Sequence, residues 1–456
     1  MKQVLIGVGS GLVAGSLALT LLFLGPLSPS ASSEPTPTTM ALPDATLSAA
    51  PTPTESEAPI EPEVIECSVV QLENSEGILS LQAEVIDTET DQVLFERSSD
   101  VAARAASVMK LFTAAAALEQ LGPDYFVTTR VYMDAVAPSK IYLVGAGDVT
   151  LSRTEATKQS VYRNAPKLQT LAKKVLSVFG EDQILEIVLD SSLYGGTSGE
   201  YQSVWDQRGL TNGYMSPVSA LQVDGDRENP AAKDSPRSKD PVSQAGDWFQ
   251  ESLGDAALNA TISKGLAPAD AIEIASVKSR PISEWIDYML VVSDNTLAEA
   301  LARLISLDVQ LDGSFDSLTA AYKKALAKTG LDLSDLVVED GSGLSKYNQV
   351  APETVNDLLD LIDEGYGDFE IILGGMPVSG TPGSLSYRFE DAVGSITAKT
   401  GWIRTGYSLA GFLDTVTGSR LRFTVYNLGD VTSANREAMD ELVMGFYECG
   451  TDLVNR

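Results

Sequence analysis

Three short motifs with polar side chains stand far apart in this chain: Ser107-Val-Met-Lys110, Ser293-Asp-Asn295 and Lys399-Thr-Gly401. None of them is specific alone, because patterns this short recur by chance in most chains of this length. Together they supply a serine that can act as a nucleophile, a lysine that can act as its base, and further polar groups for a substrate. A fold that uses all three must bring three distant segments of the chain to one cleft.

The chain has no histidine among its 456 residues. This absence excludes the Ser-His-Asp triad, the Cys-His dyad and every metal site that is built on imidazole. If a serine of this chain forms a covalent intermediate, a lysine must take its proton. We therefore expect nucleophilic catalysis without a metal ion and without a cofactor.

The first motif opens a segment with helical character. Apolar residues recur along Ser107–Leu121, and Gly122-Pro123 would end the helix. Lys110 follows Ser107 by three residues, which places both side chains on one helix face. The serine would also lie near the positive end of the helix dipole, where developing negative charge is stabilised.

The other two motifs are placed by their neighbours. Ser293-Asp-Asn295 follows the apolar stretch Trp285–Val292 and would lie on a connection between two helices, where short polar side chains can face a cleft. The segment Gly394–Thr400 alternates like a strand. At the end of that strand Lys399 offers a charge and Thr400 a hydroxyl, which together suit a carboxylate.

The motifs and four longer stretches resemble one known family. The stretches are Ile141–Leu151, Asp340–Ser345, Met376–Leu385 with Arg388-Phe389, and Ala398–Gly401 followed by Leu409–Phe412. In this combination the chain resembles, over about residues 75–450, a class C low-molecular-mass penicillin-binding protein, a D-alanyl-D-alanine carboxypeptidase/endopeptidase of peptidase family S13. The resemblance implies an α/β fold (α+β, multidomain). Its catalytic domain, of the serine β-lactamase and transpeptidase type, would have an antiparallel sheet flanked by helices and carry one or two β-rich inserted domains.

The resemblance also implies roles for the catalytic residues. Ser107 would be the nucleophile and Lys110 its base. Ser293 would relay a proton to the leaving amine, and Asn295 would bind the peptide amide. Positive charge from Lys399, together with partial burial, should lower the pKa of Lys110.

Substrate binding would fall to the third motif. Thr400 would bind the terminal carboxylate together with Lys399, and Gly401 borders the same subsite. Trp402 stands where members of the family usually carry threonine. Its backbone N–H can still serve an oxyanion hole with that of Ser107, but one hydroxyl for the carboxylate is missing.

The resemblance implies partners of one chemical kind. The substrates would be peptidoglycan stem peptides, and β-lactam antibiotics would be covalent inhibitors. Two alternatives stay open: a β-lactamase or esterase on the same fold, and a non-catalytic protein that binds the cell wall. The net charge of −31, from 63 acidic and 32 basic residues, argues against nucleic acid as a partner.

The composition changes along the chain and predicts its organisation. Residues 1–25 are predicted to be a signal peptide or a membrane anchor, and 26–66 a disordered linker rich in Pro, Thr, Ser and Glu. The chain would therefore be exported to the bacterial cell envelope. Residues 67–124 and 281–456 would form a split catalytic domain. Residues 125–280 would form one or two inserted accessory domains, because this span is too long for a loop.

The only two cysteines, Cys67 and Cys449, stand at the two ends of the predicted folded region. An even number of cysteines in an exported protein favours pairing. Because the ends of a domain are often close in space, we expect a disulfide between them rather than two free thiols.

Overall fold

The computed structural model describes residues 67–180, 182–197 and 199–454. The predicted signal peptide or anchor (1–25) and the predicted linker (26–66) lie outside the described residues. The chain divides into two compact units, residues 1–63 and 64–456, and all described helices and strands belong to the second.

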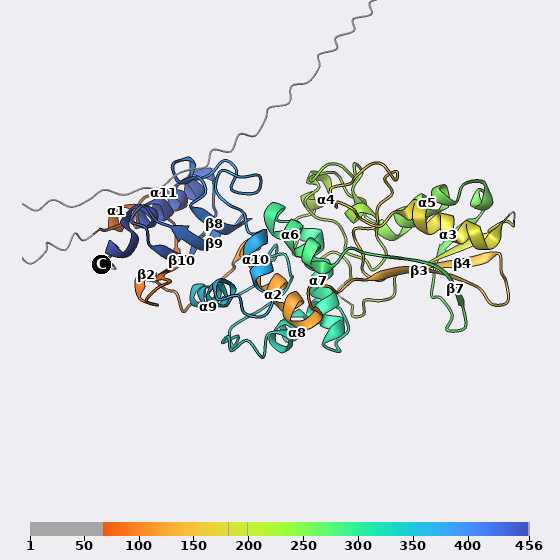
Figure 1. Ribbon diagram of the computed structural model, residues 1–456, viewed down its shortest axis with the longest axis horizontal. Helices are drawn as coiled ribbons and strands as arrows, with labels where there is room; N and C mark the ends of the chain where they lie inside the picture. The colour runs from red at the N-terminus through yellow and green to blue at the C-terminus, as the bar shows by residue number, and fades with distance from the viewer. Residues whose placement is uncertain (1–66, 181, 198, 455–456) are drawn as a thin grey trace, which may run out of the picture. The chain divides into compact units, whose positions relative to one another are not determined.

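The first sheet contains both the earliest and the latest strands of the folded region (Figure 1). Its five strands are antiparallel, in the order β2-β1-β10-β9-β8. Because β1 pairs with β10, the two ends of the folded region share one sheet. The edge strand β8 carries the third motif. The strands are β1 (Leu81–Asp87), β2 (Val93–Arg97), β8 (Ile396–Ile403), β9 (Gly406–Asp414) and β10 (Arg420–Leu428).

Helices cover both faces of this sheet, and the alternation of β9 explains why. Leu409 and Leu413 are buried in the core that includes α11, whereas Ala410 and Phe412 are buried in the core that includes α9. Successive side chains of a strand point to opposite faces, so β9 joins the two cores. The helices are α9 (Pro352–Asp363) on one face, and α11 (Ser433–Cys449) with α1 (Val70–Glu73) on the other.

A cluster of helices next to this sheet surrounds one buried helix, α2 (Met109–Leu121). Every residue of α2 from Met109 to Leu118 is buried, including Lys110. A 3₁₀ turn, η1 (Ala106–Val108), precedes α2 and contains Ser107. Four helices pack around α2: α6 (Ile282–Val292), α7 (Asn295–Asp308), α8 (Leu318–Ala325) and α10 (Glu370–Gly375).

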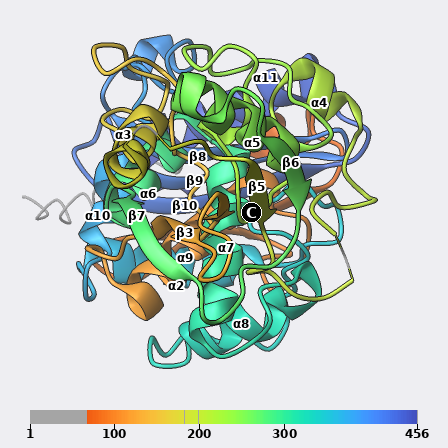
Figure 2. The same ribbon diagram turned by 90° about the vertical axis from the view of Figure 1, so that its right-hand side faces the viewer.

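A second five-stranded sheet is built from the middle of the chain, and Figure 2 faces this part. Its order is β6-β5-β4-β3-β7, and it is mixed, since β4–β5 and β5–β6 are parallel and the other pairs antiparallel. Helices α3 and α5 pack on it and on each other. The elements are β3 (Thr128–Met133), β4 (Lys140–Val144), β5 (Glu186–Asp190), β6 (Thr261–Lys264), β7 (Ile272–Lys278), α3 (Leu168–Phe179) and α5 (Pro241–Leu253).

Short helical turns complete the described part of the chain. They are α4 (Arg208–Asn212), η2 (Asp224–Asp226), η3 (Gly254–Ala257), η4 (Phe315–Ser317), η5 (Glu390–Ala392) and η6 (Gly450–Asp452).

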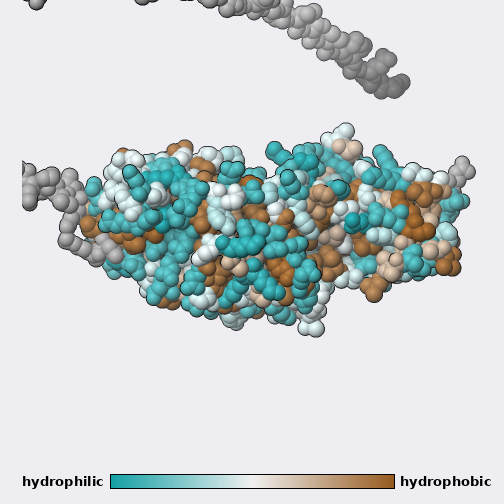
Figure 3. All heavy atoms as spheres, turned by 60° about the horizontal axis from the view of Figure 1, so that its bottom comes forward, coloured by the Kyte–Doolittle hydropathy of each residue, from teal (hydrophilic) through white to brown (hydrophobic). Residues whose placement is uncertain are grey.

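Hydrophilic side chains dominate the face in Figure 3, with hydrophobic patches toward the end that carries the second sheet. Four exposed apolar side chains lie in or beside the strand ends there: Val136, Leu185, Leu258 and Ile272. Within residues 67–454, leaving out the two undescribed positions, no helix is long and apolar enough to cross a bilayer.

The predicted fold class is confirmed: an antiparallel sheet flanked by helices, together with a second region that contains strands. The division at residues 125 and 280 stays a prediction, although all strands of the second sheet lie between Thr128 and Lys278. Two boundaries differ from expectation. Ser107 lies in a 3₁₀ turn rather than in the α-helix itself, and β8 begins at Ile396 because Gly394 has a φ of +81° in the preceding turn.

The expected disulfide between Cys67 and Cys449 is present, with a Cα–Cα distance of 5.4 Å. Cys67 also forms a parallel β-bridge with Leu453, so the two ends of the described chain are joined twice. The bond closes a loop with a sequence separation of 382 residues.

Candidate active site

The three motifs meet at one pocket of about 260 Å³. Its lining comes from η1, from the end of α6, from the loop before β8, and from β8, β9 and α11. The lining residues are Ser107, Ser293, Ser384, Arg388, Thr400, Gly401, Trp402, Tyr407 and Arg436. Lys110, Asn295 and Lys399 lie behind this surface and contact it from within, as the following distances show.

Lys110 is joined directly to the expected nucleophile. Its Nζ donates to Ser107 Oγ at 2.9 Å, to Asn295 Oδ1 at 2.7 Å and to the carbonyl oxygen of Ser342 at 2.6 Å. Ser107 Oγ also lies 3.3 Å from that carbonyl oxygen. Lys110 Nζ therefore has three acceptors, and one of them is the hydroxyl that the neutral amine would deprotonate.

The pKa of Lys110 is lowered to about 8, and burial is the main cause. The nearby carboxylates of Glu299, Asp340 and Asp294 oppose this shift, while positive charge from Lys233 adds to it. The expected lowering of the pKa is therefore present. Lys233 of the middle region is a further positive charge that the sequence did not indicate, and Lys110 and Lys399 also repel one another, since the charge of Lys110 lowers the pKa of Lys399.

The second motif forms the junction between α6 and α7. Ser293 ends α6 in the left-handed conformation, with a φ of +60°, and Asp294 caps α7 by accepting the N–H of Leu297 at 3.0 Å. Asp294 is also paired with Arg227 at 2.7 Å, and both side chains are almost fully buried. Arg227 thus ties the middle region of the chain to this motif.

The side chain of Asn295 has its orientation fixed by two neighbours. Its Oδ1 accepts from Lys110, and its Nδ2 donates to the carbonyl oxygen of Tyr214 at 2.9 Å. Asn295 does not line the pocket. Its contact with a peptide amide therefore stays a prediction.

Lys399 lies deeper than the sequence suggests. It is fully buried, and its Nζ donates to Ser293 Oγ at 3.0 Å and to the carbonyl oxygen of Thr400 at 2.8 Å. Burial lowers the pKa of Lys399 well below its usual value, and the charges of Lys110 and Lys233 lower it further. Lys399 therefore contacts Ser293, and Thr400 is the residue of this pair that faces the pocket, with its hydroxyl 2.8 Å from Ser384 Oγ.

Gly401 allows β8 to approach the nucleophile closely. A Cβ atom at this position would lie 2.1 Å from Ser408 Oγ and 2.8 Å from the backbone nitrogen of Ser107. Trp402, the next residue, is 56% exposed, and its ring centroid lies 6.4 Å from that of Tyr407. The use of the Trp402 N–H in an oxyanion hole stays a prediction.

Several residues at this site were not singled out for a role by the sequence. Ser342 acts through its carbonyl oxygen, which no residue type reveals. Ser384 and Arg388 lie in or beside a stretch that carries the family resemblance, so a signal existed for them. Arg436, from α11, had no sequence signal. Arg388, which precedes β8, is paired with Asp440 of α11, the helix that also carries Arg436.

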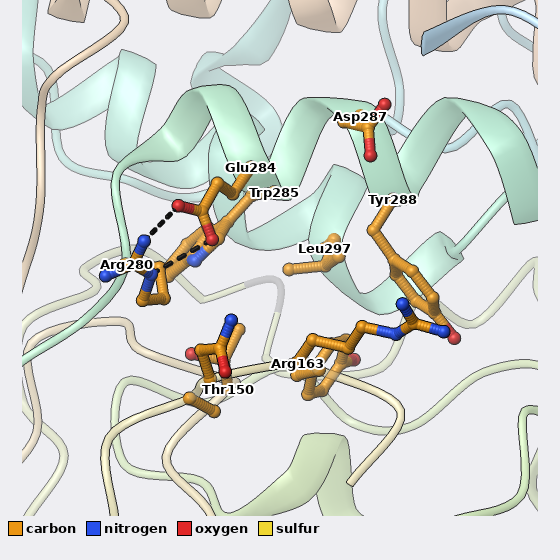
Figure 4. A pocket seen from close by; sticks show the side chains of 11 residues that line it. Thr150, Arg163, Arg280, Glu284, Trp285, Asp287, Tyr288 and Leu297 are labelled. Carbon is orange, nitrogen blue, oxygen red and sulfur yellow. Dashed lines mark hydrogen bonds and ion pairs between the residues drawn. The ribbon is translucent and has the colours of Figure 1, made fainter. Parts of the chain in front are cut away.

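A second pocket, of about 240 Å³, lies between α6 and the segment Tyr162–Ala165 (Figure 4). Its wall includes the rings of Trp285 and Tyr288. Tyr162 also contacts Asp294 of the second motif, with its hydroxyl 3.4 Å from Oδ2. The second pocket contains none of the site residues that the sequence predicts.

A serine whose hydroxyl contacts a buried lysine, beside an antiparallel sheet that helices cover on both faces, defines a serine-type hydrolase of the penicillin-binding class. The chain belongs to the D-Ala-D-Ala carboxypeptidase 3 (S13) family, whose pattern matches residues 79–235 and 226–446. Members of this family act on peptidoglycan, and this chain is a serine-type D-Ala-D-Ala peptidase of the cell wall.

Individual relatives agree with the family over most of the chain. The chain is 28% identical over 450 residues to the carboxypeptidase DacB of Mycolicibacterium smegmatis, with 96% of this chain and 95% of that protein covered. It is 28% identical over 436 residues to a D-alanyl-D-alanine carboxypeptidase of Actinomadura sp., with 80% of each covered. The structure of penicillin binding protein 4 from Haemophilus influenzae shares the fold, with a TM-score of 0.70, 20% identity, and coverage of 83% of this chain and 99% of that one.

Proposed function

We propose that Ser107 is the nucleophile of this peptidase and that Lys110 is its base. The observation that carries the proposal is the 2.9 Å contact between Lys110 Nζ and Ser107 Oγ, made by a lysine whose pKa is lowered to about 8. A lysine with an ordinary pKa of about 10.4 would hold its proton at neutral pH. Burial of Lys110 therefore raises the fraction of neutral amine, which is the form that the reaction needs.

The acylation step uses the contacts around Ser107. Its Oγ attacks the carbonyl carbon between two D-alanines while the proton passes to neutral Lys110. Backbone N–H groups of Ser107 and Trp402 hold the oxyanion. The C–N bond then breaks, and a proton returns from Lys110 through the hydroxyl of Ser293 to the leaving amine. The product is an ester between Ser107 and the shortened peptide.

Water completes the cycle. It attacks the ester carbonyl while neutral Lys110 takes one of its protons, and Lys110 then gives that proton to Ser107 Oγ as the ester bond breaks. Lys399 keeps Ser293 Oγ in position, since its Nζ lies 3.0 Å from that oxygen. A bound stem peptide would place its terminal carboxylate at Thr400 and Ser384, with the arginines of the pocket nearby.

The β-lactam ring offers a carbonyl in place of the peptide, so penicillin would acylate Ser107. A β-lactam complex is known for penicillin binding protein 4 of Haemophilus influenzae, which shares the fold. We also propose that the chain is exported and acts in the cell envelope, where residues 1–25 serve as a signal peptide or an anchor. The apolar composition of that segment supports this proposal.

Two measurements test the assignment of the nucleophile. Intact-mass analysis after incubation with benzylpenicillin should find one stoichiometric adduct, and peptide mapping should place it on Ser107. Ser107→Ala should abolish the adduct and lower turnover of a pentapeptide by several orders of magnitude. An adduct that persists in the variant would refute the assignment. Defined muropeptides, with products read by mass, then separate release of terminal D-alanine from cleavage of cross-links.

A further inference from the structure

Glu299 is a fully buried acid on α7 to which the reaction assigns no step. Its two carboxylate oxygens accept from two consecutive backbone N–H groups: Oε2 from Gly341 at 3.1 Å, and Oε1 from Ser342 at 2.7 Å. Hydrogen bonds to an ionised acceptor are about twice as strong as those between neutral groups. Glu299 thus fixes one short segment of backbone from inside the protein.

The other side of the same segment faces the reacting atoms. The carbonyl oxygen of Ser342 accepts from Lys110 Nζ at 2.6 Å and lies 3.3 Å from Ser107 Oγ. Glu299 therefore contacts the N–H of Ser342, and the carbonyl of Ser342 contacts Lys110. The carboxylate acts on the lysine through the backbone of one residue.

The spacing on α7 brings this contact together with a second one. Asn295 and Glu299 are four residues apart and so lie on one helix face. Asn295 Oδ1 accepts from Lys110 directly at 2.7 Å. One face of α7 therefore holds Lys110 both directly and through Ser342.

The segment that contains Ser342 has little room to move. A Cβ atom on Gly341 would lie 2.6 Å from the Cβ atom of Ala302 on α7. A Cβ atom on Gly343, which has a φ of +85°, would lie 1.8 Å from the carbonyl oxygen of Ala106. The segment is thus packed between α7 and the turn that carries Ser107. A shift on the α7 side would be passed on to the nucleophile.

We propose that Glu299 is a positioning residue for Lys110: through the backbone of Ser342 it holds Nζ against Ser107 Oγ. This inference rests on the proposed function, in which Lys110 is the base. It adds a residue that touches neither substrate nor nucleophile.

The charges around Lys110 and Glu299 decide in which direction the pKa of Lys110 moves when Glu299 is replaced. Burial lowers the pKa of Lys110, and Glu299 is the largest charge that raises it again. Burial raises the pKa of Glu299 to about 8 and the carboxylate of Asp340 adds to that rise, while the hydrogen bonds from Gly341 and Ser342 favour the ionised form, so Glu299 and Lys110 titrate over the same pH range. The titratable and charged groups that face Lys110 or Glu299 are Asp340 from the turn before Ser342, Asp294 and Arg303 from α7, Tyr322 from α8, Lys233 from the middle region and Lys399 from β8. Removing only the charge of Glu299 should therefore lower the pKa of Lys110.

The test is the pH dependence of acylation by a fluorescent penicillin, measured on the full chain between pH 6 and 10. In the wild type the rate should rise with pH as Lys110 loses its proton, around pH 8. Glu299→Gln keeps the shape and one acceptor oxygen, but its amide N–H₂ faces the other of the two backbone N–H donors. We expect its maximal acylation rate to fall about tenfold. The pH at which the rate rises should move down by about one unit, the usual size for loss of one close opposite charge.

A second variant separates charge from position. Glu299→Asp keeps the charge but shortens the side chain. Its acylation rate should therefore rise at the same pH as in the wild type, while its maximal rate falls several-fold. If Glu299→Gln does not fold, this variant still decides, because a wild-type rate in Glu299→Asp would overturn the proposal. Glu284→Gln, on the exposed side of α6, is the matched control and should change neither quantity.

Other outcomes also bear on the inference. If folded Glu299→Gln acylates with the wild-type pH dependence, the role of the charge is refuted. If the pH at which the rate rises moves equally in Glu299→Gln and Glu299→Asp, Glu299 has only a structural role. A wild-type rate that does not rise around pH 8, together with acylation retained in Lys110→Met, would refute the proposed function and the inference built on it.

Discussion

The substitution Asp294→Asn would test how strongly the second motif depends on one buried ion pair. Asp294 and Arg227 retain 3% and 1% of their side-chain exposure, and their closest atoms are 2.7 Å apart. Asparagine has the same shape and can still accept the N–H of Leu297, so the cap of α7 is largely kept. The variant removes the negative charge and leaves the guanidinium of Arg227 buried without its partner.

The expected loss is large because a buried charge without its partner is costly. Removal of one member of a buried pair destabilises by about 3–5 kcal/mol. Arg227 keeps three neutral acceptors, the Tyr162 hydroxyl and the carbonyl oxygens of Asp224 and Lys233, so we expect the lower end, about 3 kcal/mol. With a urea dependence of about 2–3 kcal/mol per molar, the transition seen by tryptophan fluorescence should move down by about 1–1.5 M.

Asp206→Asn is the matched control, because Asp206 pairs with Arg208 on the surface, with 44% and 70% of the side chains exposed. An exposed pair contributes about 0–1 kcal/mol, so the transition should move by only a few tenths of a molar. Equal shifts in the two variants would refute the reasoning. Acylation by penicillin should also slow in Asp294→Asn alone, since Ser293 and Asn295 flank the altered residue.

The pH dependence of the Asp294 effect has a definite sign. Burial alone would raise the pKa of Asp294, but the charge of Arg227 and the hydrogen bond from Leu297 outweigh it, and the pKa is lowered. A carboxylate with a lowered pKa in the folded state stabilises fully above its unfolded pKa of about 3.9 and loses this effect as the pH falls through the folded value. The difference between wild type and Asp294→Asn should therefore be constant from pH 6 to 8 and shrink only in acid.

Two further predictions concern the edge strand and the disulfide. Gly401→Ala should lower the acylation rate by about 100-fold, because its Cβ would press on Ser408 and on the backbone of Ser107, whereas Gly374→Ala, which has open space around it, should have little effect; equal rates in the two variants would contradict the close approach of β8. Replacing Cys67 and Cys449 by serine should lower the stability by up to about 5 kcal/mol on the chain-entropy argument for so long a loop, and an unchanged thermal midpoint would show that the loop closure contributes little.

The sequence predicted those features of the site that depend on local geometry. Ser107 and Lys110 are three residues apart, and one turn of helix suffices to bring them into contact. The strand that carries Lys399 followed from its alternation, and the antiparallel sheet followed from the family resemblance. The bond between Cys67 and Cys449 could be predicted because only one pairing was available.

The remaining features depend on packing between distant segments. Lys399 is enclosed by β8 and the end of α6, and its Nζ donates to Ser293 Oγ, which the sequence did not indicate; its contact with a substrate carboxylate stays a prediction. The carbonyl of Ser342 cannot be singled out from a sequence, since every residue has one. Lys233 and Arg227 come from the middle of the chain, where no motif marked them, and their roles depend on how that region packs on the second motif.

The buried charges of this site have a common chemical consequence. Lys110 and Lys399 are fully enclosed, and burial is the main cause of the lowered pKa of each. Enclosure alone would make a lysine a weak base that is always neutral, whereas Glu299 and Asp340 bring the pKa of Lys110 back to about 8. The amine then loses its proton easily and still takes one from Ser107. In a chain without histidine, this balance between burial and paired carboxylates gives a lysine the range of protonation that a histidine has by itself.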